Sequence, residues 1–416
     1  MTKKPVFPFT KEFPALARGL GGRKMIYLDS ACTALKMRSA AGAHNELLLH
    51  LGGCGGRRSS HALARAVEEL YGGARADAAV FTGAQSPDEI IFTSGATEAA
   101  NIFAGGFPFT PEKNEVILSP LEHNSVFLPF YNLSKTGKIK LKVMPLKGFK
   151  PDIKAFARML SKRTALVCAA RASNFFGGVI DLKSIAELAR QAGAAVFSDD
   201  AQYAPTHPVG AASSGADALA FSGHKLGAPF GTGVLWVKKA LLNRLNPFKV
   251  GGGVVKSVER SGSGFEVEYL RDYQGFEAGI QNYAGAFAMA RAFKTLSALG
   301  HENIRAHMAE IVSYAYERLS AVRKIKVLGE PEDLKNGALL PFVPAGRAFS
   351  PADLNIFLNT YYKDRFIAVR TGRHCADLAS LNSGLAETAR LSFFVYTSKR
   401  DIDVFISALQ KYLSFL

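Results

Sequence analysis

The fold is decided by residues 217–237, which read DALAFSGHKLGAPFGTGVLWV. The stretch predicts a short buried strand, a turn of Ser222-Gly223-His224-Lys225, a glycine-rich loop and a second buried strand. A lysine just past the end of a buried strand loses water from its ammonium group, which lowers its pKa and frees the amine for Schiff-base chemistry. Taken alone, the same four residues also fit an ordinary surface loop.

Outward from this stretch, short apolar runs alternate with amphipathic helical patterns. This alternation predicts an α/β fold with a largely parallel, buried sheet. The predicted strands are Met25–Leu28, Glu89–Thr93, Glu115–Leu118, Leu141–Met144, Thr164–Ala169, Ala194–Ser198, Ala218–Phe221 and Val234–Val237. Helical patterns cover His61–Ala78 and Leu182–Ala192, and a longer one runs from Ala284 to Leu319. Short strands and helices follow to the C-terminus, which indicates a second, smaller α+β domain.

The composition is that of a globular protein. The chain has 416 residues, of which 48% are hydrophobic and 21% charged, and this balance excludes disordered and fibrous classes. No apolar run reaches the roughly 18 residues that a membrane span needs, and Met1–Pro14 lacks the apolar core of a signal peptide. Cys32, Cys54, Cys168 and Cys375 form no metal-type pairs, so we expect no metal site, and free thiols in a reducing cytoplasm.

The net charge is +16, from 51 Lys and Arg against 35 Asp and Glu. Such an excess suits an anionic partner, but it also suits a basic protein whose charge is spread over its surface. The basic residues occur singly or in short groups such as Arg57-Arg58 and Lys238-Lys239, without an arginine-rich tail or a nucleic-acid-binding motif. We therefore favour a spread charge and expect no nucleic-acid partner.

Three further segments could complete a site around Lys225. Asp199 ends the preceding strand, and a carboxylate there can keep a pyridine nitrogen protonated, as a pyridoxal-phosphate site requires. The run Phe92–Glu98 leads from a strand into a helix, where Thr97 and backbone N–H groups can hold a phosphate. His123 could stack on an aromatic cofactor and move protons. Each segment also has an ordinary explanation, as a turn cap, a helix cap and a loop histidine.

In this order, the motifs resemble those of the class V aminotransferases, which are pyridoxal-phosphate enzymes of fold type I. The matching segments are Tyr27–Ala31, Gly95–Glu98, Glu122-His123, Ser173-Asn174, Asp199–Gln202, Ser222–Lys225, Gly251–Gly253, Phe276–Gly279 and Arg370–Ala376. The last of them resembles the active-site loop of the SUF-type (group II) cysteine desulfurases.

The resemblance implies a division of the chain into three parts. Residues 31–297 would form a large cofactor-binding domain around a mainly parallel seven-stranded sheet. Residues 298–416 would form a small α+β domain that carries the catalytic cysteine loop. Residues 1–30 would be an N-terminal segment that packs with the small domain.

The resemblance also implies a role for each matched residue. Lys225 would form a Schiff base with pyridoxal 5'-phosphate and shuttle the proton of the substrate Cα. Asn174 and Arg390 would hold the substrate carboxylate, the arginine through its two-pronged guanidinium. The other cofactor contacts would be Asp199 to the pyridine nitrogen, Gln202 to the phenolic oxygen, His123 stacked on the ring, and Ala96, Thr97, Ser222 and His224 around the phosphate.

Cys375 decides which reaction the resemblance implies. Arg370, Arg373 and His374 lie beside it in sequence and supply positive potential, which favours a nucleophilic thiolate. That thiolate would take the sulfur of L-cysteine as a persulfide and leave L-alanine. An incidental small residue in the loop is the ordinary explanation of Cys375.

Some positions depart from the family pattern. Ile280 stands where relatives commonly have a threonine that reaches the phosphate in the neighbouring subunit, and Asp200 replaces a glycine beside the cofactor aspartate. Arg373 replaces a histidine. Cys32 and Cys54 fall in segments that border the site in this family, and we interpret them as bystanders, with Cys32 the more interesting.

The sequence therefore predicts a cytoplasmic, pyridoxal-phosphate-dependent cysteine desulfurase. It would be a homodimer that passes sulfur to an acceptor protein, for iron–sulfur or other sulfur-transfer pathways, without a membrane or nucleic-acid partner. The alternatives with the same cofactor are a selenocysteine lyase, another C–S lyase and a class V aminotransferase that acts on a different amino acid. A non-catalytic basic binding protein on the same fold is a more distant alternative, because every polar group of the cofactor site is present.

Overall fold

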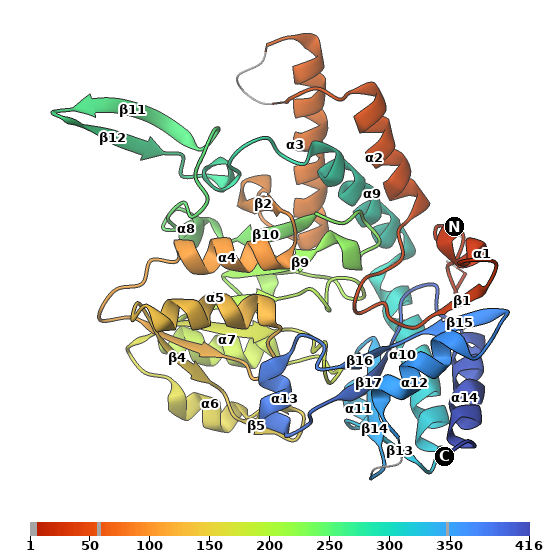
Figure 1. The fold of residues 1–416 in the computed structure, drawn as a ribbon. Coiled ribbons are helices and arrows are strands. Elements are labelled where there is room, and N and C mark those ends of the chain that lie inside the picture. The colour runs from red at the N-terminus through yellow and green to blue at the C-terminus, as the bar shows by residue number, and fades with distance from the viewer. Residues whose placement is uncertain (1–5, 56–59, 347–348) are drawn as a thin grey trace.

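The computed structural model describes residues 6–55, 60–346 and 349–416. At the centre lies a seven-stranded sheet with the order β2-β10-β9-β8-β7-β3-β4 (Figure 1). Its strands are β2 (Ile90–Thr93), β3 (Glu115–Leu118), β4 (Lys140–Val143), β7 (Thr164–Ala170), β8 (Ala195–Asp199), β9 (Ala218–Ser222) and β10 (Gly233–Val237). Only β10 runs antiparallel to its neighbours. The predicted α/β fold with a mainly parallel seven-stranded sheet is confirmed.

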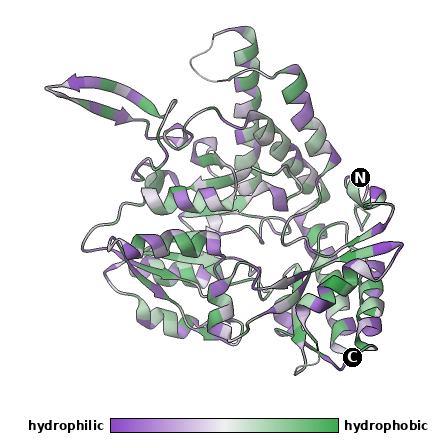
Figure 2. Ribbon diagram, viewed as in Figure 1, coloured by the Kyte–Doolittle hydropathy of each residue, from purple (hydrophilic) through white to green (hydrophobic). Residues whose placement is uncertain are grey.

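Both faces of this sheet are buried, because side chains along each strand alternate between two hydrophobic layers. In β9, Ala220 belongs to the layer shared with α4 and α5, whereas Leu219 belongs to the layer shared with α3, α7 and α9. Figure 2 shows hydrophobic colour along the central strands and mixed colour on the helices around them. The helices of this part are α2 (Arg38–His50), α3 (Ala62–Thr82), α4 (Ala96–Gly106), α5 (Asn124–Lys135), α6 (Ile153–Met159), α7 (Leu182–Gln191), α8 (Lys239–Leu242) and α9 (Tyr283–Leu299).

The C-terminal part has its own four-stranded antiparallel sheet, of order β13-β14-β17-β16. Its strands are β13 (Ile325–Val327), β14 (Leu339–Pro344), β16 (Arg370–Gly372) and β17 (Thr388–Ser392). Its helices are α10 (His301–Ser320), α11 (Pro331–Leu334), α12 (Pro351–Thr360), α13 (Asp377–Ser383) and α14 (Lys399–Leu413).

The N-terminal segment contains α1 (Pro14–Arg18) and β1 (Lys24–Tyr27). β1 pairs in parallel with β15 (Arg365–Ala368), and the Phe9 N–H donates to the Val395 carbonyl oxygen at 2.7 Å. These contacts tie the first residues to the C-terminal part. The division of the chain at residues 30 and 297 stays a prediction.

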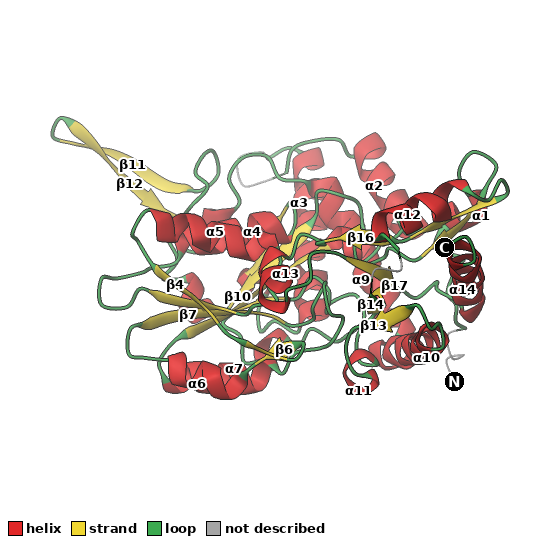
Figure 3. Cartoon of the chain, turned by 60° about the horizontal axis from the view of Figure 1, so that its bottom comes forward, coloured by secondary structure: helices red, strands yellow, loops and turns green. Residues whose placement is uncertain are grey.

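A hairpin of β11 (Val255–Ser261) and β12 (Gly264–Tyr269) extends away from the body of the molecule (Figures 1 and 3). A further short pair joins β5 (Leu146–Lys147) to β6 (Lys150–Pro151). The 3-10 turns are η1 (Pro87–Glu89), η2 (Ala211–Ser213), η3 (Gly223–Lys225) and η4 (Tyr273–Phe276). Within the described ranges, every helix is too short or too polar to cross a bilayer.

Candidate active site

A cavity of about 200 Å³ lies at the carboxyl ends of β8 and β9. The carboxyl ends of parallel strands are the usual place for a ligand in such a sheet, because loops from several strands meet there. Its lining residues are Ala31, Cys32, Ala96, Thr97, His123, Ser125, Asn174, Asp199, Ala201, Ser222, His224, Lys225, Arg370, His374, Cys375 and Arg390. The cavity therefore brings together every predicted site residue except Gln202.

Lys225 and Asp199 supply an amine and a carboxylate to the cavity. Lys225 ends the η3 turn after β9, and Asp199 is the last residue of β8. Burial lowers the pKa of Lys225, although the nearby Asp199 carboxylate partly opposes this shift. Burial also raises the pKa of Asp199, against the attraction of Lys225 and a hydrogen bond of 2.9 Å from the Ala201 N–H. Burial thus favours the neutral amine at Lys225 relative to an exposed lysine, and the Asp199 carboxylate suits a buried N–H donor.

The start of α4 forms a small anion cradle with β9. The Ala96 N–H donates to the Ser222 hydroxyl at 2.8 Å, and the Thr97 side chain is exposed toward the cavity rim. Gly95 has φ +154°, and a Cβ there would lie 3.2 Å from Ser222 Oγ, so a side chain would crowd the cradle. Free N–H groups at a helix start and a backbone that approaches closely are what a phosphate needs.

Two histidines face this part of the cavity. Burial, together with the charges of Lys225 and Arg390, lowers the pKa of His123 to about 3. The Ser125 N–H donates to His123 Nδ1 at 3.1 Å, so the neutral ring carries its proton on Nε2. Burial also lowers the pKa of His224 to about 4, and its Nδ1 lies 3.1 Å from the Thr33 hydroxyl.

Arg390 and Asn174 face the cavity from the C-terminal sheet and from the loop after β7. The Arg390 side chain is 2% exposed; its Nη1 donates to the Asn174 carbonyl oxygen at 2.6 Å, and its Nη2 lies 3.3 Å from Asp29 Oδ1. Arg390 Nε is buried and has no hydrogen-bond partner among the described residues. An incoming carboxylate could supply that partner. The Asn174 amide donates to the His374 carbonyl oxygen at 2.7 Å.

Cys375 lies on the turn between β16 and α13, with its side chain exposed at the cavity. His374 and Cys375 have φ of 54° and 55°, in the left-handed region that non-glycine residues avoid at a cost of about 1–2 kcal/mol each. His374 Nε2 lies 2.8 Å from the Thr388 hydroxyl and anchors the turn to β17. The thiol therefore stands on a strained turn held by its neighbours.

The structure adds one contact that the sequence did not indicate. Arg370 Nη1 lies 2.9 Å from Cys32 Sγ, and both residues line the cavity. The only signal in the sequence was that Arg370 begins one family motif and Cys32 directly follows another. Gln202 lies outside the cavity lining, since its Nε2 donates to the Ala31 carbonyl oxygen at 2.8 Å.

Asp200, the residue that departs from the usual glycine, is fully buried and points to other partners. Its Oδ2 lies 2.8 Å from Arg171 Nη1, and its Oδ1 accepts from the Ser198 hydroxyl at 2.5 Å. Arg171 in turn stacks on Tyr203, with 3.8 Å between the guanidinium carbon and the ring centroid. Asp200 is therefore neutralised within the fold and does not line the cavity.

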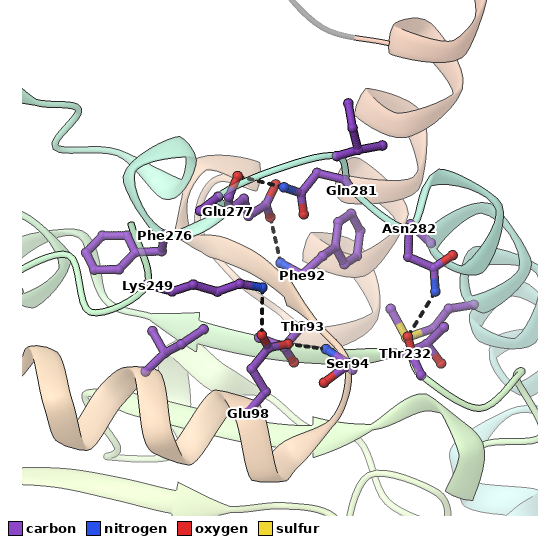
Figure 4. A pocket seen from close by; sticks show the side chains of 17 residues that line it. Phe92, Thr93, Ser94, Glu98, Thr232, Lys249, Phe276, Glu277, Gln281 and Asn282 are labelled. Carbon is purple, nitrogen blue, oxygen red and sulfur yellow. Dashed lines mark hydrogen bonds and ion pairs between the residues drawn. The ribbon is translucent and has the colours of Figure 1, made fainter. Parts of the chain in front are cut away.

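A second cavity, of about 190 Å³, lies on the other side of the turn into α4 (Figure 4). Glu98 projects into it, accepts from the Ser94 N–H at 2.6 Å and pairs with Lys249 at 3.0 Å. Partial burial opposes the ionisation of Glu98, but these two hydrogen bonds prevail and lower its pKa. Ile280 lies at this cavity and is 75% exposed, so its side chain is available to a neighbouring molecule.

The donor set of the first cavity fits pyridoxal phosphate. An amine whose pKa is lowered by burial, a buried carboxylate, a neutral imidazole and a phosphate cradle meet at the strand ends of a mainly parallel sheet. This combination of fold and site defines a class, the pyridoxal-phosphate enzymes of fold type I.

Comparison with known proteins agrees with that class. The sequence matches the class V aminotransferase family over residues 26–405, and the chain belongs to this family. It is 32% identical to a probable cysteine desulfurase of Streptomyces coelicolor, over 97% of this chain and 96% of that protein. It is 33% identical to a probable cysteine desulfurase of Halalkalibacterium halodurans, with 96% of each chain covered. The crystal structure of the cysteine desulfurase CsdA (S-sulfonic acid) from Escherichia coli superposes with a TM-score of 0.87 at 29% identity, over 99% of this chain and 100% of that one.

Proposed function

We propose that this chain is a pyridoxal-phosphate-dependent cysteine desulfurase, which converts L-cysteine to L-alanine and takes the sulfur onto Cys375. The observation that carries the proposal is that Lys225, Asp199 and Cys375 line one cavity. The relatives named as cysteine desulfurases, similar over nearly their whole length, support it.

In this proposal, the buried end of the cavity holds the cofactor. When bound, pyridoxal phosphate withdraws electrons from the substrate Cα. Lys225 would hold it covalently and His123 would lie against its ring, while Asp199 would face the pyridine nitrogen. The phosphate would be held by Ala96, Thr97, Ser222 and His224. Gln202 would reach the phenolic oxygen only after its side chain leaves the Ala31 carbonyl.

Lys225 and Arg390 would handle the amino acid itself. Because burial lowers the pKa of Lys225, its Nζ would accept the Cα proton more readily than an exposed lysine would at the same pH, and would return it to the product. Arg390 would bind the substrate carboxylate through its unpartnered Nε and an adjacent Nη. The Asn174 amide would release the His374 carbonyl oxygen and donate to the substrate carboxylate instead.

Cys375 would act as the sulfur acceptor. Its thiolate would attack the substrate sulfur, so that an S–S bond forms, the Cβ–S bond breaks and the bonding electrons stay with the carbon fragment that becomes alanine. The exposed position of the thiol would let the persulfide be passed on to an acceptor protein. Since the chain is basic, an acceptor with an acidic surface would associate fastest. Free thiols at all four cysteines suit the reducing cytoplasm that we propose as its compartment.

We also propose that the protein is a homodimer in which the hairpin β11–β12 contacts the second copy. Val258 and Val267 are cross-strand partners, and Phe265 lies on the same face two residues from Val267. All three side chains are exposed. An isolated two-stranded hairpin is marginally stable in water, so this apolar face suits a surface that packs against another chain.

The substrate is tested by supplying the purified, cofactor-loaded protein with cysteine, selenocysteine and other amino acids side by side. The proposal expects alanine from cysteine, with loss of that turnover in Cys375→Ser. Alanine from selenocysteine alone would instead identify a selenocysteine lyase, and keto-acid formation without released sulfur would identify an aminotransferase.

A further inference from the structure

The turn that carries Cys375 is held by the residue that follows His123. Asn124 begins α5, and its backbone N–H donates to the Cys375 carbonyl oxygen at 2.8 Å. Its side chain forms two hydrogen bonds with Asp377, the first residue of α13: Asn124 Nδ2 donates to Oδ2 at 2.7 Å, and the Asp377 N–H donates to Asn124 Oδ1 at 3.3 Å. The two helices lie side by side (Figure 3). Asn124 thus forms hydrogen bonds with the chain at Cys375 and again at Asp377.

The strained turn depends on such hydrogen bonds, because a left-handed backbone at His374 and Cys375 persists only where the surrounding structure imposes it. On the other side, the turn is held by the Asn174 amide at the His374 carbonyl oxygen. Asn174 is also the residue proposed to bind the substrate carboxylate, so it cannot hold the turn throughout the reaction. Asn124 and Asp377 have no such second task, and neither lines the cavity.

The other charged group that faces Asp377 is Arg373, whose Nη1 lies 3.5 Å from Oδ1. The Arg373 side chain is 61% exposed, and exposed ion pairs of this kind contribute little. The hydrogen bonds to Asn124 are therefore the main link between Asp377 and the rest of the fold.

We propose that Asn124 and Asp377 form a clamp that fixes the position of the Cys375 thiol over the cavity. The clamp rests on the proposed function, in which sulfur passes to Cys375. Both are positioning residues that act through Cys375, because transfer between two sulfur atoms requires near-contact geometry and a misplacement of about 1 Å can cost about 100-fold in rate.

The test compares Asn124→Ala and Asp377→Ala with the wild type in the cofactor-loaded protein. Without substrate, the rate at which iodoacetamide alkylates Cys375 should rise about tenfold, because the turn opens more often; mass analysis of the Cys375 peptide measures it. With cysteine, kcat should fall about 10- to 100-fold while KM changes less than about threefold.

Three matched variants separate the clamp from its surroundings. Asp377→Asn keeps an oxygen that can accept from Asn124 Nδ2. Its alkylation rate and its kcat should therefore both stay within about threefold of wild type. Arg373→Lys alters the exposed ion pair but keeps the positive charge near Cys375, and Asn382→Ala removes an exposed amide from the same helix. Both should leave the alkylation rate unchanged.

Unchanged alkylation in the alanine variants would overturn the clamp, as would a loss of kcat that merely parallels loss of bound cofactor. Both alanine variants remove the hydrogen bond from Asn124 Nδ2 to Asp377 Oδ2, so if one variant fails to fold, the other decides. If the wild type makes no alanine from cysteine but the alkylation rates still rise as expected, the proposed function fails and the clamp on the turn stands.

Discussion

The two walls of the cavity are built on different principles. The wall of Lys225 and Asp199 comes from the ends of buried strands, where the backbone is regular and burial shifts the pKa of each group. The wall of Cys375 is a turn of left-handed residues, exposed at its thiol and held by side chains from elsewhere. The chemistry of the first wall depends on the exclusion of water from Lys225 and Asp199. The chemistry of the second wall depends on where the turn holds the Cys375 thiol.

The largest effect is expected on the buried wall. Lys225→Ala removes the only amine that we assign to proton transfer, so turnover of cysteine should fall by at least about 1000-fold. The absorption band at about 420 nm that marks the lysine-bound cofactor should disappear as well. Lys326→Ala, at an exposed lysine, is the control. If Lys225→Ala kept the band and the turnover, the assignment of this wall would be wrong.

Acid should destabilise the folded protein through both walls of the cavity, because each wall contains a histidine whose pKa is lowered by burial. Burial lowers the pKa of His123 and of His374 to about 3, while an unfolded histidine keeps an ordinary value of 6.5. As the pH falls below 6.5, the unfolded state binds protons first, so each histidine costs up to about 1.4 kcal/mol of stability per pH unit until the folded pKa is reached.

The histidine on the exposed wall offers a direct check of this linkage. The gap in Tm between wild type and His374→Gln should narrow as the pH is lowered from about 6.5 to about 4.5, since only the wild type loses this contribution. Asn382→Ala, which removes an exposed side chain that does not titrate, should keep a constant gap. A gap that stays constant for His374→Gln would show that this ring is protonated in the folded protein.

The smallest effect concerns Ile280, which the family resemblance places near the phosphate of the second copy in the proposed dimer. Ile280→Thr should tighten cofactor binding about threefold to tenfold in the dimer, the gain expected for one added hydrogen bond. Fluorescence titration of cofactor-free protein with pyridoxal phosphate measures it. Ile280→Val adds no hydroxyl and serves as the control. Equal binding by both variants would place residue 280 away from the phosphate of the second copy.

The same contrast explains what the sequence could predict. Lys225 and Asp199 directly follow apolar runs, so local pattern placed them at strand ends, and the structure brings them into one cavity. The contact between Asn124 and Asp377 joins positions 253 residues apart, and no local pattern encodes it. The left-handed turn at residues 374 and 375 was equally hidden, because neither residue is a glycine. The orientation of Gln202 depends on which acceptor lies nearest, which only the packed fold decides.

In the proposed reaction, the buried wall releases sulfur and the exposed wall receives it. The most direct measurement treats the cofactor-loaded protein with L-cysteine in the absence of reductant, and then determines the mass of the peptide that contains Cys375 and the amount of alanine formed. We expect one added sulfur atom on Cys375 and an equal amount of alanine in a single turnover, and neither in Cys375→Ser. Alanine formed at the same rate in that variant, or sulfur found only on another cysteine, would contradict it.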